Sequence, residues 1–191
     1  MRAPLVGVLA LQGGFAAHEA VLRKLGADVR EVRTPADLEG LDGLVIPGGE
    51  STTMTLGIER EGLAEPLRAF AAAGRPVFGT CAGLIMLDRR HLGIMDIVAE
   101  RNAFGRQLHS FEEDLQFPGL EGGPVRAVFI RAPWISEHGD KVEVLAAVDG
   151  HPVAARQGGL FVISFHPELG DDHRLHEQFL AQVRASTNGR G

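Results

Sequence analysis

The first half of the chain alternates short hydrophobic runs with longer segments of mixed character. The runs are rich in Val, Leu and Ile at consecutive positions, which is typical of strands buried on both faces of a parallel sheet. Gly or Pro residues follow these runs closely and end them. The pattern predicts strands at 5–11, 28–32, 44–46 and 77–78.

The segments between these strands place hydrophobic residues at helical spacing. Ser51 is a favourable N-cap residue for the segment that follows it. We therefore expect helices at 15–25, 51–58 and 63–73. Strand–helix alternation of this kind indicates an α/β fold, in which helices cover both faces of a mostly parallel central sheet. In such sheets, functional residues gather beyond the carboxyl ends of the strands.

The second half of the chain contains more strands than helices. Glycine-containing turns at 149–150 and 157–159 join hydrophobic runs, so extra antiparallel strands are expected here. A helix at 172–183 follows them, and the small polar residues 186–191 are expected to form a frayed tail. The expected strands lie at 94–99, 125–130, 142–148, 153–155 and 160–165. Because no repeat or linker interrupts the pattern, we expect a single domain over 1–191.

Composition and charge exclude several classes of protein. The 191 residues carry a formal net charge of −6, which argues against a general nucleic-acid binder, since such a protein needs a basic surface. No hydrophobic run approaches the ~20 residues that cross a bilayer, and the N-terminal run leads into Gln12 rather than into a signal-peptide cleavage site. A single cysteine excludes an internal disulfide. We therefore expect a cytoplasmic protein that binds neither nucleic acid nor membrane.

The only cysteine, Cys81, lies between two glycines at a predicted strand-to-helix turn. Gly79 and Gly83 lack the Cβ atom that would crowd such a sharp turn. At the start of a helix, the helix dipole and the free N–H groups favour the thiolate, which is the reactive form of cysteine. A lone cysteine is otherwise most often a small buried hydrophobic residue, so this interpretation needs a base elsewhere in the chain.

Among the eight histidines, His166 is the best candidate for that base. It directly follows the hydrophobic run 160–165, and Pro167 favours an extended backbone for it. Side chains two residues apart point the same way in extended chain, so Glu168 is positioned to orient the imidazole. The alternative is a turn at a strand end with a solvated glutamate.

The loop after the third predicted strand offers donors for the oxyanion of an acyl-transfer reaction. Gly48 and Gly49 leave their backbone N–H groups free of side-chain obstruction, and the amide of Ala82 follows the candidate nucleophile. A double glycine after a strand is also common in ordinary loops. This loop therefore supports the catalytic interpretation only together with the cysteine and the histidine.

Several stretches taken together resemble the glutaminase subunit of pyridoxal 5′-phosphate synthase, a class I (triad) glutamine amidotransferase. They are PGGESTTM at 47–54, FGTCAGLI at 78–85, HLG at 91–93, ERNAFGRQ at 100–107, FIRAP at 129–133 and SFHPE at 164–168. The resemblance covers nearly the whole chain and implies a flavodoxin-like, three-layer fold. The segment between Leu87 and His91 is shorter than in many relatives, and we expect it to be a surface loop.

The resemblance also implies a reaction and the residues that perform it. The implied reaction is hydrolysis of L-glutamine to L-glutamate and ammonia through a thioester on the cysteine, and it requires no metal or organic cofactor. The implied catalytic triad is Cys81, His166 and Glu168, and the implied oxyanion site is formed by Gly48, Gly49 and Ala82.

The glutamine pocket implied by the resemblance is lined by Gly49, Glu50, Ser51, Arg101, Ile130 and Arg131. Glu50 suits the α-ammonium group of glutamine. Arg101 or Arg131 suits the α-carboxylate, because the planar guanidinium forms paired hydrogen bonds with a carboxylate. Arg106 is a further candidate for the same pocket. Each arginine, taken alone, is also compatible with an ordinary surface ion pair.

A separate partner protein is implied as well. Ammonia is useful only if it is passed on before it protonates and escapes, and nothing in the chain suggests a second, ammonia-consuming domain. The resemblance names the acceptor as the synthase subunit, which builds pyridoxal 5′-phosphate from ribose 5-phosphate, glyceraldehyde 3-phosphate and ammonia in a large hetero-oligomeric complex. It also implies low activity without the partner, because the family completes its oxyanion hole on contact with the synthase subunit.

Two other polar clusters are expected to lie outside the catalytic site. His18 and Glu19 are expected on the surface of the first helix, which in the family helps to form the face toward the synthase subunit. The acidic pair at 171–172 is expected at a helix N-terminus, where negative charge is favourable, with His173 and His176 solvated. A metal site at this second cluster is the less favoured alternative.

Three alternative functions stay open. A cysteine hydrolase or peptidase of similar fold would not need the head-group residues Glu50, Arg101 and Arg131. A glutaminase subunit of another pathway, such as histidine biosynthesis, is disfavoured by the stretches at 100–107 and 129–133. A catalytically silent regulatory subunit is disfavoured by the intact Cys-His-Glu set.

Overall fold

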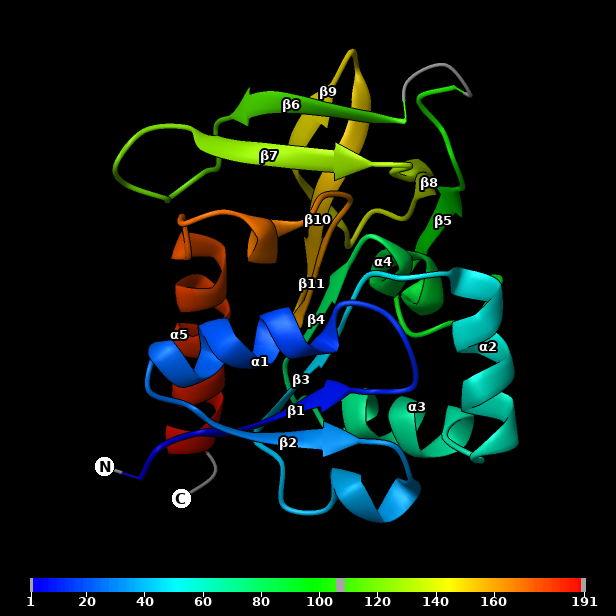
Figure 1. Ribbon diagram of the computed structural model, residues 1–191, viewed down its shortest axis with the longest axis vertical. Coiled ribbons are helices and arrows are strands. Elements are labelled where there is room, and N and C mark those ends of the chain that lie inside the picture. Colours follow the sequence, from blue (N-terminus) through cyan, green and yellow to red (C-terminus); the bar gives the residue numbers. More distant parts are fainter. Residues whose placement is uncertain (1, 106–108, 190–191) are drawn as a thin grey trace.

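The computed structural model describes residues 2–105 and 109–189 and is built around a seven-stranded sheet (Figure 1). Its strands are β1 (Leu5–Leu9), β2 (Asp28–Val32), β3 (Gly43–Ile46), β4 (Val77–Thr80), β9 (Glu143–Val148), β10 (His151–Gln157) and β11 (Leu160–Ile163). They lie in the order β2-β1-β3-β4-β11-β10-β9. Neighbouring strands from β2 to β11 are parallel, whereas β10 is antiparallel to both of its neighbours.

Helices cover both faces of this sheet (Figure 1). They are α1 (Phe15–Lys24) and α5 (Arg174–Asn188) on one face, and α2 (Ser51–Arg60), α3 (Ala64–Ala72) and α4 (Ala82–Leu87) on the other. Each face has its own hydrophobic core, with Phe78 and Phe179 in the first and Met54 and Leu84 in the second. The predicted three-layer α/β fold is confirmed.

Two small antiparallel sheets extend the second half of the chain. β5 (Ile97–Glu100) pairs with β8 (Trp134–His138), and β6 (Ser110–Leu115) pairs with β7 (Val125–Ile130). Antiparallel strands were expected in this half, but β6 and β8 were not among them. The sequence of β6, SFEEDL, lacks a hydrophobic run, and its pairing with β7 is stabilised by ion pairs from Arg126 to two of its acidic side chains.

The C-terminal helix is longer than the sequence pattern predicted. α5 continues to Asn188, so the expected frayed tail at 186–191 begins as helix. The hydroxyl of Thr187 donates a hydrogen bond of 2.9 Å to the carbonyl oxygen of Val183 and thereby supports this last turn. In the described part of the chain, no helix has the length and hydrophobicity needed to span a bilayer.

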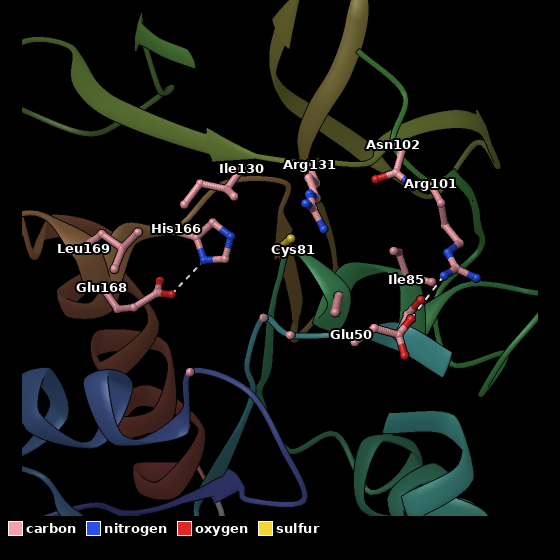
Figure 2. Close-up of a pocket in the computed structure, with 15 residues that line it drawn as sticks. Glu50, Cys81, Ile85, Arg101, Asn102, Ile130, Arg131, His166, Glu168 and Leu169 are labelled. Atoms are coloured by element: carbon pink, nitrogen blue, oxygen red, sulfur yellow. Dashed lines mark hydrogen bonds and ion pairs between the residues drawn. The ribbon is translucent and has the colours of Figure 1, made fainter. Parts of the chain in front are cut away.

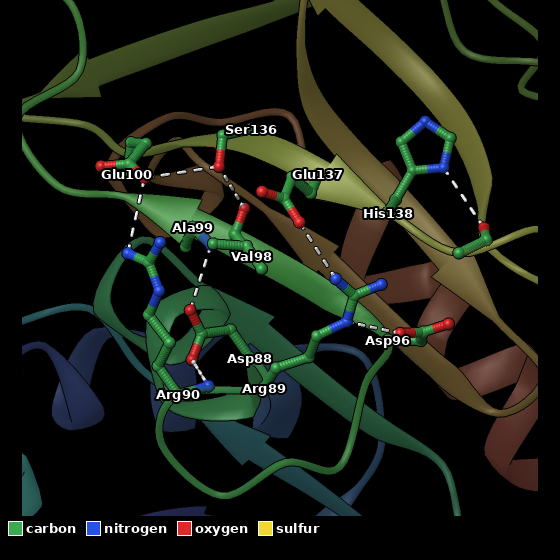
Figure 3. A network of polar contacts seen from close by, with 11 residues as sticks. Asp88, Arg89, Arg90, Asp96, Val98, Ala99, Glu100, Ser136, Glu137 and His138 are labelled. Carbon is green, nitrogen blue, oxygen red and sulfur yellow. Dashed lines mark hydrogen bonds and ion pairs between the residues drawn. The ribbon is translucent and has the colours of Figure 1, made fainter.

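A polar network attaches the end of α4 to β5 (Figure 3). Asp88 directly follows α4, is fully buried, and accepts hydrogen bonds from the backbone N–H groups of Arg90 and Ala99 at 2.9 and 3.0 Å. Arg89 donates to Asp96 at 2.6 Å. The expected surface loop is therefore exposed at its two arginines but anchored by a buried carboxylate, which fixes the helix that follows the candidate nucleophile.

Candidate active site

Cys81 occupies a tight turn between β4 and α4. Its backbone adopts φ 51° and ψ −107°, an unfavourable conformation for a residue with a side chain. A Cβ atom on Gly83 would lie 2.0 Å from the carbonyl oxygen of Ile46, and one on Gly79 would lie 2.8 Å from the carbonyl oxygen of Gly83. Both flanking glycines are therefore required by close packing, which confirms the predicted strand–turn–helix elbow.

The order of the sheet brings His166 to Cys81. β4 and β11 are parallel neighbours, with Thr80 opposite Ile163, and the amide of Cys81 donates a hydrogen bond of 2.9 Å to the carbonyl oxygen of Ile163. His166 lies just beyond β11 in the extended conformation that Pro167 favours, with φ −109° and ψ 90°. The imidazole therefore lies beside the sulfur at the carboxyl ends of the two strands (Figure 2).

Glu168 orients the imidazole of His166. The His166 Nδ1 and Glu168 Oε1 atoms are 2.8 Å apart, and the side chain of Glu168 is only 3% exposed. Because an ionised carboxylate only accepts hydrogen bonds, we assign a proton to Nδ1, which leaves Nε2 for Cys81. This is the orientation that a base acting on the thiol requires.

The charges around His166 favour its protonated form. Burial by itself lowers the pKa of His166, but the hydrogen bonds and charges of Cys81 and Glu168 outweigh it and raise the pKa to about 10. Burial raises the pKa of Glu168, but the hydrogen bond from His166 and the positive charge of its imidazolium bring it below its ordinary value. The site therefore holds an ionised Glu168 and stabilises an imidazolium, the form that protonates a leaving group.

A pocket of about 610 Å³ opens beside these side chains (Figure 2). Its size suits a small metabolite. Besides the Cys-His-Glu set, it is lined by Gly48, Gly49, Glu50, Ser51, Ala82, Arg101, Ile130 and Arg131. All eight of these residues were expected at the oxyanion site or in the glutamine pocket. Arg106, the further candidate, lies outside the described residues.

The pocket also has lining residues that were not expected from the sequence. They are Gly14, Ile85, Asn102 and Leu169. Asn102 directly follows an expected pocket arginine and adopts a left-handed backbone with φ 47°, so its place in the ERNAFGRQ stretch was a usable signal. Leu169 is 56% exposed and directly follows Glu168, so it places a hydrophobic surface at the pocket.

Glu50 caps a helix and also forms an ion pair. Its carboxylate accepts hydrogen bonds from the backbone N–H groups of Thr53 and Thr52 at 2.6 and 3.0 Å. Glu50, not Ser51, is therefore the N-cap of α2, because its longer side chain reaches both amides. These hydrogen bonds, led by that of Thr53, lower the pKa of Glu50 to about 2. Arg101 Nη2 lies 3.2 Å from Glu50 Oε1, so the pocket wall presents opposite charges side by side.

Arg131 enters the pocket from the end of β7. Its backbone is left-handed, with φ 46°, and its N–H group donates a hydrogen bond of 2.8 Å to the carbonyl oxygen of His109. Figure 2 shows its guanidinium directed into the pocket between Cys81 and Arg101. The pocket therefore contains a second cationic side chain besides the one paired with Glu50.

The double-glycine loop packs tightly against the candidate nucleophile and base. A Cβ atom on Gly48 would lie 2.7 Å from Cε1 of His166 and 3.3 Å from Cβ of Cys81. Gly49 has φ 153°, and a Cβ atom there would lie 2.2 Å from the side-chain amide nitrogen of Gln12. The loop backbone thus lies within reach of a substrate carbonyl at the sulfur, while its oxyanion role, shared with the amide after the cysteine, stays a prediction.

The expected surface position of His18 and Glu19 is wrong, and so is the expected solvation of His176. His18 and His176 are fully buried, and Glu19 is 6% exposed. His18 precedes Val21 and Leu22 by three and four residues, which puts it on the hydrophobic face of α1. That spacing was the signal available in the sequence. Among the described residues, no group of three or more His, Cys, Asp and Glu side chains is arranged to hold a metal ion.

Comparison with known proteins places the chain among the glutamine amidotransferases. A crystal structure of a glutamine amidotransferase matches with a TM-score of 0.88 and 46% identity over 94% of this chain and 98% of that one. A model of the SNO glutamine amidotransferase family matches residues 8–185, and the chain belongs to this family.

Similar proteins carry a more specific name. The chain is 56% identical to "Pyridoxal 5′-phosphate synthase subunit PdxT" of Geobacillus kaustophilus, over 94% of each chain. It is 52% identical to the protein of the same name from Frankia alni, over 100% of each chain. The expected family resemblance is thereby confirmed.

Proposed function

We propose that this protein is the glutaminase subunit of a pyridoxal 5′-phosphate synthase and hydrolyses L-glutamine to L-glutamate and ammonia. The observation that carries the proposal is the meeting of Cys81, His166 and Glu168 at one pocket, in a chain that matches the SNO family over nearly its whole length. The names of the similar proteins support the same function.

Cys81 is the nucleophile in this proposal. The thiol passes its proton to His166 Nε2, a transfer that the raised pKa of His166 favours before substrate binds, and the sulfur attacks the side-chain amide carbon of glutamine. The imidazolium then protonates the amide nitrogen, the carbon–nitrogen bond breaks, and ammonia leaves behind a γ-glutamyl thioester. His166 next removes a proton from water, which attacks the thioester. Cleavage of the carbon–sulfur bond releases glutamate and restores the thiol.

Other groups stabilise the charges that form in these steps. Glu168 keeps the proton on His166 Nδ1 and stabilises the imidazolium across their 2.8 Å contact. Backbone amides near Gly48-Gly49 and at Ala82 are proposed to bind the oxyanion of each tetrahedral intermediate. No metal or organic cofactor takes part in the proposed chemistry.

The charged wall of the pocket fits the head group of an amino acid. Glu50 is ionised and lies beside Arg101, so a glutamine placed here has a carboxylate for its α-ammonium group and a guanidinium for its α-carboxylate. Arg131 is a second candidate for the α-carboxylate. Ile130 is 39% exposed at the same pocket and offers contact to the methylene groups of the substrate.

The ammonia is proposed to pass to a separate synthase subunit in the cytoplasm. The similar proteins are themselves named as subunits, and this chain spans 94–100% of their length. A glutaminase of this kind requires an acceptor that uses ammonia before it protonates and diffuses away. A large hetero-oligomeric complex with the synthase subunit satisfies this requirement.

Glutamate release from glutamine tests the proposal directly. The wild type and Cys81→Ala are assayed alone and with the candidate synthase subunit. We expect turnover by the assembled wild type, lower turnover by the isolated chain, and none by Cys81→Ala. An inactive assembled wild type, or full activity of Cys81→Ala, would overturn the proposal.

A further inference from the structure

The catalytic carboxylate has one oxygen that the Cys-His-Glu set does not use. Glu168 Oε1 contacts His166, whereas Oε2 is buried and forms no hydrogen bond among the described residues. Oε2 faces Nε2 of His18 at 3.5 Å. The side chain of His18 is fully buried, so water does not compete for this contact.

His18 also contacts two other elements of the fold. Its Nε2 atom lies 3.1 Å from the hydroxyl of Thr80, the residue before the nucleophile, and its Nδ1 atom lies 2.9 Å from Nε2 of His176. His176 is fully buried on α5, and its ring packs edge-on against Phe78. A polar chain therefore runs from α5 through α1 to the catalytic carboxylate, beneath the elbow.

The available hydrogen-bond partners determine which ring nitrogens donate along this chain of polar contacts. Nδ1 of His176 has no partner among the described residues, and an unpartnered buried acceptor is more easily tolerated than an unpartnered donor. Nε2 of His176 therefore carries the proton and donates to Nδ1 of His18. His18 is then protonated at Nε2, which directs its N–H toward Glu168 and Thr80.

The opposite tautomers are disfavoured at both ends. They would leave a buried Nδ1–H of His176 without an acceptor and would turn the Nε2 lone pair of His18 toward an ionised carboxylate. Burial also keeps both rings neutral, because it lowers the pKa of His18 to about 4 and that of His176 to about 3, although the charge of Glu168 opposes the shift at His18. Each ring then has a single N–H to place.

We propose that His18 is a positioning residue for the glutaminase reaction: its Nε2–H holds Glu168 so that Oε1 stays aligned with His166, and His176 fixes the tautomer of His18. This inference rests on the proposed function for its kinetic readout. His18 touches neither substrate nor sulfur, and it acts only through the carboxylate. The chain of contacts extends the triad into the core between α1 and α5.

Two substitutions of His18 separate positioning from packing. His18→Gln keeps a donor near the position of Nε2, whereas His18→Leu keeps the bulk and removes the donor. In the assembled complex, we expect His18→Leu to lower kcat by roughly 10- to 100-fold with little change in KM, since small misplacements of a catalytic group cost this much. His18→Gln should recover most of the rate. Leu22→Val, a buried change on the same helix, is the control with unchanged kcat.

A second readout does not depend on glutamine turnover. The pH dependence of Cys81 alkylation reports how well the imidazolium and Glu168 stabilise the thiolate. We expect the alkylation profile of His18→Leu to shift to higher pH, with His18→Gln close to wild type. Wild-type kcat and an unshifted profile in folded His18→Leu would overturn the inference, as would equal impairment of the two variants at equal thermal stability. A wild type without glutaminase activity would instead contradict the proposed function alone.

The tautomers of the two buried histidines can also be observed directly in the wild-type protein. Nitrogen-15 NMR of the histidine rings distinguishes Nε2–H from Nδ1–H tautomers, and the His18→Gln spectrum assigns the signals of His18. We expect neutral, Nε2-protonated rings for His18 and His176 at pH 7. An Nδ1–H tautomer at His18 would refute the positioning role, because a lone pair would then face Glu168.

Discussion

The backbone N–H of Gly14 donates a hydrogen bond of 3.0 Å to the carbonyl oxygen of Gly48. This contact joins the turn before α1 to the double-glycine loop and fixes the orientation of the peptide between Gly48 and Gly49. Because the carbonyl and the following N–H of a trans peptide point in opposite directions, the contact also sets where the Gly49 N–H points. The proposed oxyanion site is therefore coupled to the turn that precedes α1.

Gly13→Ala should disturb that orientation. Gly13 has φ 90°, and a Cβ atom there would lie 2.0 Å from the Gly48 carbonyl oxygen, so the loop has to move. We expect kcat for glutamine hydrolysis to fall by roughly 10-fold or more. Gly26→Ala is the matched control, because Gly26 has φ 85° and nothing within 4 Å of its added Cβ.

Both alanine variants bear a backbone strain of about 1–2 kcal/mol, but only Gly13→Ala moves the loop. Gly26→Ala should therefore lose thermal stability while it keeps its kcat. Equal kcat values for the two folded variants would show that the contact between Gly14 and Gly48 does not matter for catalysis.

The choice between histidines gives a second prediction. His166→Asn should reduce turnover by roughly 10³-fold or more, because it removes the group that moves every proton in the proposed reaction. His173→Ala should leave turnover within about twofold, since His173 lies at the N-cap of α5 and its ring contacts Lys24 rather than the pocket. Steady-state glutamate release by the assembled complex measures both, and the reverse pattern would mean that another base acts.

Local sequence was enough to predict the elbow at Cys81 and the position of His166 beside it. Gly79 and Gly83 flank Cys81, and the hydrophobic run before His166 is typical of a buried strand. Functional residues of a parallel sheet gather beyond the carboxyl ends of its strands, which places the side chains of Cys81 and His166 at the same edge of the sheet. The structure has this arrangement because β4 and β11 are neighbours. The strand order itself was not readable from the sequence, since it depends on how distant segments pack.

The polar residues behind the site were harder to predict for a physical reason. A histidine on an amphipathic helix is exposed unless another element covers it, and His18 is covered by residues more than 60 positions away in sequence, such as Thr80 and Glu168. Glu50 was missed as an N-cap because Ser51 has the better intrinsic preference. Both errors concern side chains whose partners are set by tertiary contacts.

The head-group assignment of Glu50 gives a third prediction. Glu50→Gln removes the charge but keeps a carbonyl oxygen that can cap α2, so the free energy of unfolding should fall only slightly. We expect KM for glutamine to rise by roughly 10-fold or more, with a smaller change in kcat, because a charged contact to the substrate is lost. Glu61→Gln, at the other end of the same helix, is the control. An unchanged KM in Glu50→Gln would limit Glu50 to capping and to its ion pair with Arg101.

The buried histidines make stability depend on pH in a defined window. His18 and His176 have folded-state pKa values of about 4 and about 3, below the ordinary value of 6.5, so the unfolded chain binds more protons in between. Their contribution to stability is therefore fully present above about pH 6.5 and is lost as the pH falls toward these lower values. His166 has the opposite sign, because its pKa is raised to about 10 and its contribution is lost only as the pH rises above 6.5.

Between about pH 6.5 and 4.5, the two buried histidines dominate the pH dependence of the free energy of unfolding. His166 is protonated in this interval in both the folded and the unfolded state. Carboxyl groups with lowered pKa values, such as Glu168, lose their contribution only at lower pH. Across this interval, each histidine should remove about 2 kcal/mol from the free energy of unfolding. Urea unfolding at several pH values measures the slope, and His18→Gln should roughly halve it. A slope that is the same in wild type and His18→Gln would mean that His18 is protonated in the folded protein, which would contradict its neutral, Nε2–H form beside Glu168.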